Sequence, residues 1–197
     1  MQNFSPSCER NQQVIFETLL PWLQQVNSVL EIGSGSGQHA FHFCEQLAHL
    51  SWQCTDQGEY YAGLLANIDQ HNNPQITQAI ELDVNGQWPT QSYDMIYTAN
   101  SLHIMSWQSV QSLMKNLASC LNEGAFFCCY GPFKYAGEFT SPSNANFEMW
   151  LKERNKESGI RDFEALEKLA NAQQLQLVQD IKMPANNQLL IWQKSSR

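Results

Sequence analysis

Positive charge is scarce in this sequence. Its 197 residues include 11 Lys and Arg against 19 Asp and Glu, which gives a formal net charge of −8. Basic residues gather only at positions 152–157, where acidic residues alternate with them, a pattern typical of a solvated helix face. Because a chain of this charge repels polyphosphate, we expect neither DNA nor RNA as a partner.

A long hydrophobic run is also missing. No stretch reaches the roughly 18 apolar residues that a membrane span requires, and no basic, apolar leader with small residues follows Met1. We therefore expect no membrane partner and a cytoplasmic location.

The cysteines lack the spacing of a metal site. Six are present, and no Cys-x-x-Cys pair occurs among them. They fall mostly in predicted strands and helices, which favours reduced, buried thiols over a zinc site or a disulfide framework. With 43% hydrophobic residues in 197, the chain can bury a core without such cross-links. We expect one domain over residues 1–197, with no metal.

The most informative motif is an apolar strand that breaks into alternating glycines, Val29-Leu30-Glu31-Ile32-Gly33-Ser34-Gly35-Ser36-Gly37. Gly33, Gly35 and Gly37 permit a positive φ and remove the Cβ atoms that would hold a ligand away from the backbone. The first turn of the next helix then presents unpaired N–H groups. The motif predicts a nucleotide-cofactor site that includes Ser34.

The glycines alone leave two cofactor classes open, because Gly35-x-Gly37-x-x-Ala40 fits a loose dinucleotide fingerprint. Glu31 favours S-adenosylmethionine (SAM), since a carboxylate would repel a pyrophosphate but attract a sulfonium and an ammonium. The alternative for Glu31 is a solvated glutamate at a strand end.

Two further acids follow predicted strands. Asp56 ends the second strand, 19 residues after Gly37, near the position of a ribose-binding acid. Asp83 follows the third strand, where it could accept the exocyclic amine of adenine. Each acid taken alone could instead belong to a turn or a helix cap.

Strands and helices alternate along the chain, which predicts an α/β sandwich with a mostly parallel sheet. The expected helices span 7–24 (capped by Ser5 or Ser7), 38–49, 59–71, 107–121 and 161–173. The expected strands span 29–32, 50–56, 78–82, 92–98 and 124–130, followed by an antiparallel pair over 175–183 and 188–194.

These motifs resemble those of class I SAM-dependent methyltransferases. More narrowly, the chain resembles a family of proteins with a domain of unknown function that includes methyltransferase-like protein 26. The matching segments are residues 5–11, 35–40, 99–104, 130–133, 143–144, 159–162 and 183–187. The resemblance implies a Rossmann-like sandwich with a seven-stranded, mostly parallel sheet and a C-terminal antiparallel hairpin. It also implies SAM as cofactor, with Asp83-Val84 among the binding residues, and leaves the acceptor open.

The segments after the fourth and fifth strands should face the transferred methyl group. Asn100 could hold the cofactor or the substrate, or it could cap the following helix. His103 could act as general base, or it could be a packed histidine bonded to backbone. Tyr130 is the second candidate catalytic residue, and Phe133 follows it as a candidate substrate contact.

Residues 131–160 form the longest insertion and are expected to build a substrate pocket. Asn144 and Phe147 are its candidate contacts, although its aromatics could instead cover the sheet. Arg10 and Asn11 could clamp a carboxylate, or Arg10 could be an exposed residue at a helix start.

We expect a methyltransferase acting on a small molecule. Two rivals remain, a non-catalytic SAM-binding partner subunit and an NAD(P)-dependent oxidoreductase. The sequence does not indicate an oligomeric state.

Overall fold

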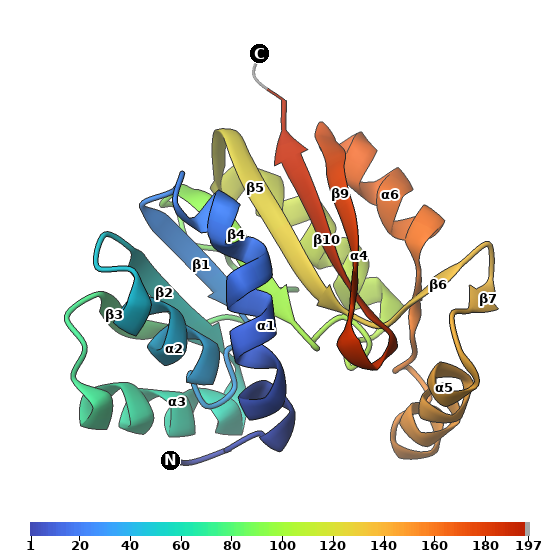
Figure 1. Cartoon of the computed structure of the whole chain (residues 1–197), viewed down its shortest axis with the longest axis horizontal. Helices are drawn as coiled ribbons and strands as arrows, with labels where there is room; N and C mark the ends of the chain where they lie inside the picture. Colours follow the sequence, from blue (N-terminus) through green and yellow to red (C-terminus); the bar gives the residue numbers. More distant parts are fainter. Residues whose placement is uncertain (196–197) are drawn as a thin grey trace. The chain divides into compact units, whose positions relative to one another are not determined.

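Strands and helices alternate through most of the chain, as the sequence predicts (Figure 1). The computed structural model describes residues 1–195. In chain order its elements are α1 (Pro6–Leu23), β1 (Ser28–Ile32), α2 (Gln38–Gln46), β2 (Ser51–Asp56), α3 (Gly58–His71), β3 (Ile76–Glu81), β4 (Tyr93–Ala99), α4 (Trp107–Leu117), η1 (Ala118–Cys120), β5 (Leu121–Gly131), β6 (Phe133–Tyr135), β7 (Glu138–Phe139), α5 (Pro142–Arg154), β8 (Arg161–Asp162), α6 (Phe163–Ala172), β9 (Leu175–Met183), η2 (Pro184–Asn186) and β10 (Asn187–Lys194).

The main sheet confirms the predicted fold class. Its seven strands follow the order β3-β2-β1-β4-β5-β10-β9. β1, β2 and β3 pair in parallel, whereas β10 pairs antiparallel with both β5 and β9. The C-terminal hairpin is therefore present as expected, and α6 packs against β9 (Figure 1).

The residues group into two compact units. Unit 1 comprises Met1–Asp83 and Tyr93–Tyr97, and unit 2 comprises Val84–Ser92 and the chain from Thr98 onward. The expectation of one domain stays a prediction.

Unit 1 is built around aromatic rings. Phe43, Trp52 and Tyr97 are fully buried, and the Trp52 ring lies 5.5 Å from Phe43 and 5.9 Å from Tyr97 between centroids. α1 packs on α2. Ser5 caps α1, because its Oγ accepts the Cys8 N–H at 3.3 Å. The other cap expected as an alternative, Ser7, lies inside the helix.

Unit 2 differs from the predicted boundaries at the end of α4. The helix was expected to continue to residue 121, but it stops at Leu117 and a 3₁₀ turn leads directly into β5 at Leu121. The Lys194 ammonium donates to the Ala118 carbonyl in the 3₁₀ turn at 2.7 Å and to the Leu121 carbonyl at the start of β5 at 2.6 Å. This contact between distant segments cannot be seen in a local pattern.

The insertion at 131–160 is more ordered than a loop. β6 pairs antiparallel with β7 and parallel with β8, forming a small second sheet, and α5 follows. Ser141 caps α5 by accepting the Asn144 N–H at 3.2 Å.

Candidate functional site

The glycine turn of unit 1 has the left-handed backbone that the motif predicts. Gly33, Gly35 and Gly37 have φ values of 72°, 59° and 85°. A Cβ on Gly37 would lie 2.9 Å from Phe41 Cζ, so packing requires this glycine. A Cβ on Gly35 would meet no atom within 4 Å, so the space beside Gly35 is open. The turn therefore leaves room for a ligand at its middle glycine.

Asp56 ties this turn to the end of β2. Its Oδ2 accepts the Gly35 N–H at 2.7 Å and its Oδ1 accepts the Gln57 N–H at 2.8 Å. Burial raises the pKa of Asp56, and the hydrogen bonds from Gln57 and Gly35 oppose that rise. Because a carboxylate has about four acceptor positions, it can still bind further donors.

Glu31 is buried and not a solvated strand end. It is 2% exposed, and its Oε2 accepts the Trp52 indole N–H at 3.0 Å. Its Oε1 lies 3.7 Å from His39 Nδ1. Ser34, which is also buried, accepts the Thr55 N–H on its Oγ at 3.2 Å. The Glu31 carboxylate, which the sequence predicted beside the turn, is thus held in place by Trp52 and His39.

The N-terminal residues predicted to clamp a substrate take different positions. Asn11 is 9% exposed and accepts the His39 Nε2–H at 2.9 Å. The Arg10 side chain is exposed and donates to Ser7 Oγ at 3.2 Å. A role in substrate binding stays a prediction for both residues.

Two side chains without a predicted role hold the N-terminal segment beside the turn. Gln38 Oε1 accepts the Ser5 N–H at 2.8 Å, and Asn67 donates to the carbonyls of Gln2 and Ser36 at 2.8 and 3.0 Å. Gln38 lies in a segment that matches the family, whereas nothing in the sequence singles out Asn67.

Asp83 and Val84 follow β3. Asp83 is exposed, and Val84 is buried, with its carbonyl accepting the Trp88 indole N–H at 3.0 Å. At the end of β3 itself, Glu81 accepts the Gly58 N–H at 3.3 Å. Glu81, to which the sequence pattern assigned no role, thus supports the start of α3.

In unit 2, Asn100 stands directly after β4 with a φ of 57°. Its N–H donates to the Tyr130 carbonyl at 2.9 Å, which joins the ends of β4 and β5. The alternative that Asn100 caps the next helix is wrong, because Ser106 caps α4 by accepting the Ser109 N–H at 3.0 Å.

His103 is 6% exposed and lies edge-on to Phe147, with ring centroids 5.2 Å apart. Burial, together with a smaller effect of the Arg161 guanidinium, lowers the pKa of His103 to about 4. The ring is therefore neutral near pH 7. Within residues 1–195 no hydrogen bond joins either ring nitrogen to a protein group. The alternative of a ring bonded to backbone is not what the structure shows.

Arg161 holds the loop that carries His103 and was not assigned a role from the sequence. It is 8% exposed, and it donates to the carbonyls of Leu102 at 2.9 Å and of Met105. Ser158 adds a hydrogen bond to the Ile104 carbonyl at 2.7 Å. Arg161 lies in the segment 159–162, which matches the family. That match was the one sequence feature that could have pointed to Arg161.

Tyr130 and Phe133 are both buried, at 3% and 1% exposure. The Tyr130 hydroxyl accepts from the Asn187 amide at 3.0 Å. Asn187 is the first residue of β10. It lies in the family-matching segment 183–187, but no sequence feature assigned it an individual role. The catalytic role of Tyr130 and the substrate contact of Phe133 stay predictions.

Asn144 is 5% exposed, and its amide donates to Thr140 Oγ1 at 2.8 Å and to the Asn186 carbonyl at 2.9 Å. It thus connects α5 to the hairpin turn. Phe147 stacks on Trp150 with 5.6 Å between centroids and also contacts His103. The structure brings Phe147 to His103, and substrate contacts stay a prediction for both Asn144 and Phe147.

The six cysteines are free thiols, and all except Cys8 are buried. Burial, with a smaller effect of Glu31, raises the pKa of Cys44 to about 12. Residues 1–195 contain no group of three His, Cys, Asp or Glu side chains that could hold a metal ion. Over the same residues, no helix is long and apolar enough to cross a membrane.

Known structures of methyltransferases share this fold. An O-methyltransferase family protein from Burkholderia thailandensis aligns with a TM-score of 0.78 at 13% identity, over 94% of this chain and 58% of that one. Human N-acetylserotonin methyltransferase, in complex with SAM, aligns with a TM-score of 0.80 at 14% identity, over 96% of this chain and 53% of that one. An O-methyltransferase family 2 protein from Planctomyces limnophilus, in complex with apigenin, aligns with a TM-score of 0.72 at 16% identity, over 93% of this chain and 62% of that one.

The fold is that of class I methyltransferases, as the resemblance implied, and this chain spans between 53% and 62% of the length of those three proteins. The profile described as "Protein of unknown function (DUF938)" matches residues 2–194, and the chain belongs to that family.

Proposed function

We propose that this protein transfers a methyl group from SAM to a small-molecule acceptor. The observation that carries the proposal is the glycine turn of unit 1, which Asp56 fastens and which leaves open space at Gly35. The shared fold supports it, because one structural neighbour was determined with SAM bound.

The residues of unit 1 fit SAM in their donors and acceptors. Within the described chain no side chain caps the first turn of α2, so its N–H groups are available to a polar group of a ligand. Asp56 keeps free acceptor positions for a ribose diol. The buried Glu31 carboxylate favours a cationic group and disfavours a pyrophosphate. These features support SAM over a dinucleotide.

SAM supplies, when bound, a methyl group on a positively charged sulfur. The protein then has to orient the acceptor, exclude water and take one proton from an O–H or N–H nucleophile. As the new bond to the methyl carbon forms, the electron pair of the broken bond stays on sulfur. We assign the proton to His103, which is neutral near pH 7 and has unpaired ring nitrogens. Arg161 positions the loop that carries His103.

Calorimetry tests the cofactor assignment. Titrating S-adenosylhomocysteine (SAH) into the purified protein should release saturable heat and raise the melting temperature. NADH should do neither. A response to NADH in place of SAH would identify an oxidoreductase.

Turnover tests the catalytic assignment. Labelled SAM and a metabolite extract should give a labelled product, and His103→Ala should lose that turnover while SAH affinity is retained. A protein that binds SAH but labels nothing would be a non-catalytic partner subunit. The cytoplasmic location and the absence of nucleic-acid and membrane partners stay predictions.

A further inference from the structure

Gln188, near the start of β10, has a buried oxygen without a donor. The side chain is 7% exposed, and across residues 1–195 nothing donates a hydrogen bond to its Oε1. Leaving such an acceptor unpaired costs about 1–3 kcal/mol, so an unpaired buried amide needs a reason. Gln188 lines a hollow of about 500 Å³ in unit 2, together with Tyr135, Asp180 and Lys182.

The strand register places Gln188 next to His103. Gln188 pairs with Gly131 of β5 on one side and with Lys182 of β9 on the other. Residues directly opposite each other in an antiparallel pair share one face of the sheet. A Cβ on Gly131 would meet one atom within 4 Å, His103 Nδ1 at 3.8 Å. His103 and the Gln188 side chain therefore border the space that Gly131 leaves.

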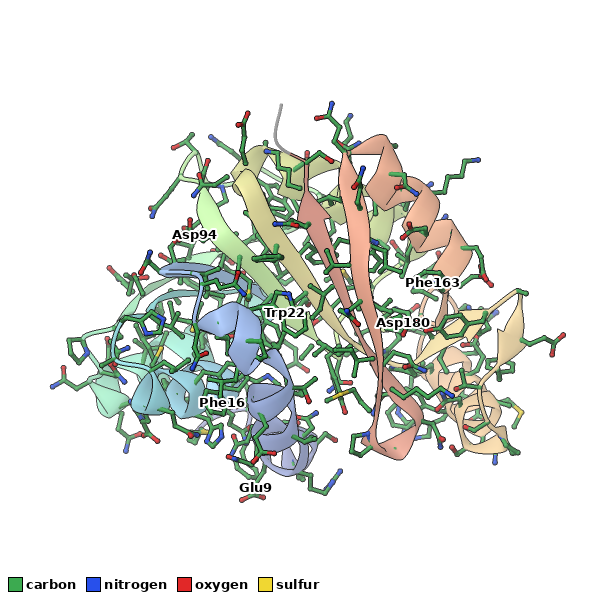
Figure 2. The ribbon with its side chains drawn as sticks, turned by 45° about the horizontal axis from the view of Figure 1, so that its top comes forward. Glu9, Phe16, Trp22, Asp94, Phe163 and Asp180 are labelled. Atoms are coloured by element: carbon green, nitrogen blue, oxygen red, sulfur yellow. The ribbon has the colours of Figure 1, made fainter. Side chains whose placement is uncertain are left out.

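Lys182 places a cation on the same face of the sheet as Gln188. In the described chain no hydrogen bond or ion pair joins its ammonium to another residue. Asp180 lies two residues earlier on the same face of β9, where it accepts the Tyr135 hydroxyl at 2.7 Å (Figure 2 labels Asp180). One lysine beside an aspartate suits a ligand with a single negative charge better than a phosphate dianion. The net charge of −8 on the chain also disfavours a dianion.

We propose that Gln188 and Lys182 select the acceptor, and that this acceptor is a small carboxylate with an O–H or N–H group. The reacting O–H or N–H donates its proton to His103, a further O–H or N–H hydrogen of the acceptor donates to Gln188 Oε1, and the carboxylate pairs with Lys182. This inference rests on the proposed methyl transfer and narrows its acceptor to hydroxy- or amino-carboxylates.

The charge of the labelled product tests the class. After reaction of a metabolite extract with labelled SAM, any amine in the product is acetylated, which removes its positive charge. The acetylated product should then bind an anion exchanger at pH 7 and be released at pH 2, where a carboxylate is neutral. Hydrolysis and mass analysis then distinguish O-methyl from N-methyl products. A product that is neutral at pH 7, including a methyl ester, or that still binds at pH 2, as a phosphate would, overturns the inference alone. No labelled product at all overturns the proposed function with it.

Variants test the two residues on that product's acceptor. Lys182→Met should raise KM about 10-fold with little change in kcat, because it removes one charged contact to the ground state. Lys168→Met, which removes an exposed lysine from α6, is the matched control and should change neither constant. Equal kinetics for the two variants would overturn the role of Lys182.

Gln188→Leu has a readout besides activity. It should raise the KM of the acceptor about 10-fold and also raise the melting temperature by about 2–4 °C, because it removes the unpaired oxygen. A lower melting temperature with unchanged KM would make Gln188 a structural residue and overturn its role.

Discussion

Two regions of this protein treat their buried polar groups in opposite ways. Beside the glycine turn of unit 1, Glu31 receives the Trp52 N–H and Asp56 receives two backbone N–H groups. In unit 2, His103 and Gln188 are also buried, but their ring nitrogens and amide oxygen lack protein partners within residues 1–195. The first region is pre-organised by its own hydrogen bonds. The second keeps hydrogen-bonding capacity that a bound molecule can use.

The largest effect should come from removing a partner in the first region. Trp52→Phe should lower the free energy of unfolding by about 3–4 kcal/mol, because it opens a cavity and leaves Glu31 Oε2 with only the weak Cys54 thiol donor at 3.9 Å. Trp192→Phe is the matched control, since Trp192 is equally buried and donates to Glu167 at 2.7 Å. Glu167 is only half-buried, so water can replace that donor and the loss should be about 1–2 kcal/mol smaller. Equal losses in urea unfolding would contradict the distinction.

His103 should make the second region sensitive to acid. Its pKa is about 4 in the folded protein and near 6.5 in a free histidine, so between these values the unfolded chain binds more protons. Its contribution to stability is complete above pH 6.5 and is lost as the pH falls to 4, by about 3 kcal/mol. His103→Gln should flatten the pH dependence of unfolding by that amount. Parallel curves for the two proteins would show that the ring is not buried as described.

Asp56 should matter for both the turn and the cofactor. Asp56→Ala should weaken SAH binding by roughly 1.5–3 kcal/mol, because it removes charged hydrogen bonds to the ribose. It should also lower stability, since the Gly35 and Gln57 N–H groups lose their acceptor. Asp56→Asn retains an acceptor oxygen, so it should fold better while still binding SAH weakly. Unchanged SAH affinity in calorimetry would refute the ribose assignment.

The smallest effect on folding is expected at Gly35. Gly35→Ala should cost about 1 kcal/mol, the strain of a left-handed residue with a Cβ, because nothing lies within 4 Å of that atom. Gly37→Ala should cost more, since its Cβ would press on Phe41. The order should be reversed for SAH affinity. Gly35→Ala should weaken SAH binding more than Gly37→Ala does, although it costs less stability. Similar losses of stability for the two variants would show that the space at Gly35 is not open.

Patterns with a short period were predictable from the sequence. The strand that ends at Ile32, the glycine turn and the strand that ends at Asp56 lie where hydrophobicity and glycine spacing place them. The turn at 184–187 likewise indicated the C-terminal hairpin. Two boundaries differed. The helix α4 stops at Leu117, and the Ala118 carbonyl beyond it pairs with the distant Lys194. At its other end the local cap is Ser106 and not Asn100.

The sequence by itself determined the fold class of this protein, because alternating strands, a glycine turn and acids at strand ends are local features that follow from backbone geometry. Only the tertiary structure decided which polar side chains are already paired. Glu31 and Trp52 are 21 residues apart, and Gly131 and Gln188 meet only through the register of β5 with β10. Whether a buried group has a partner depends on such long-range packing, so no local pattern could show that His103 and Gln188 remain without one.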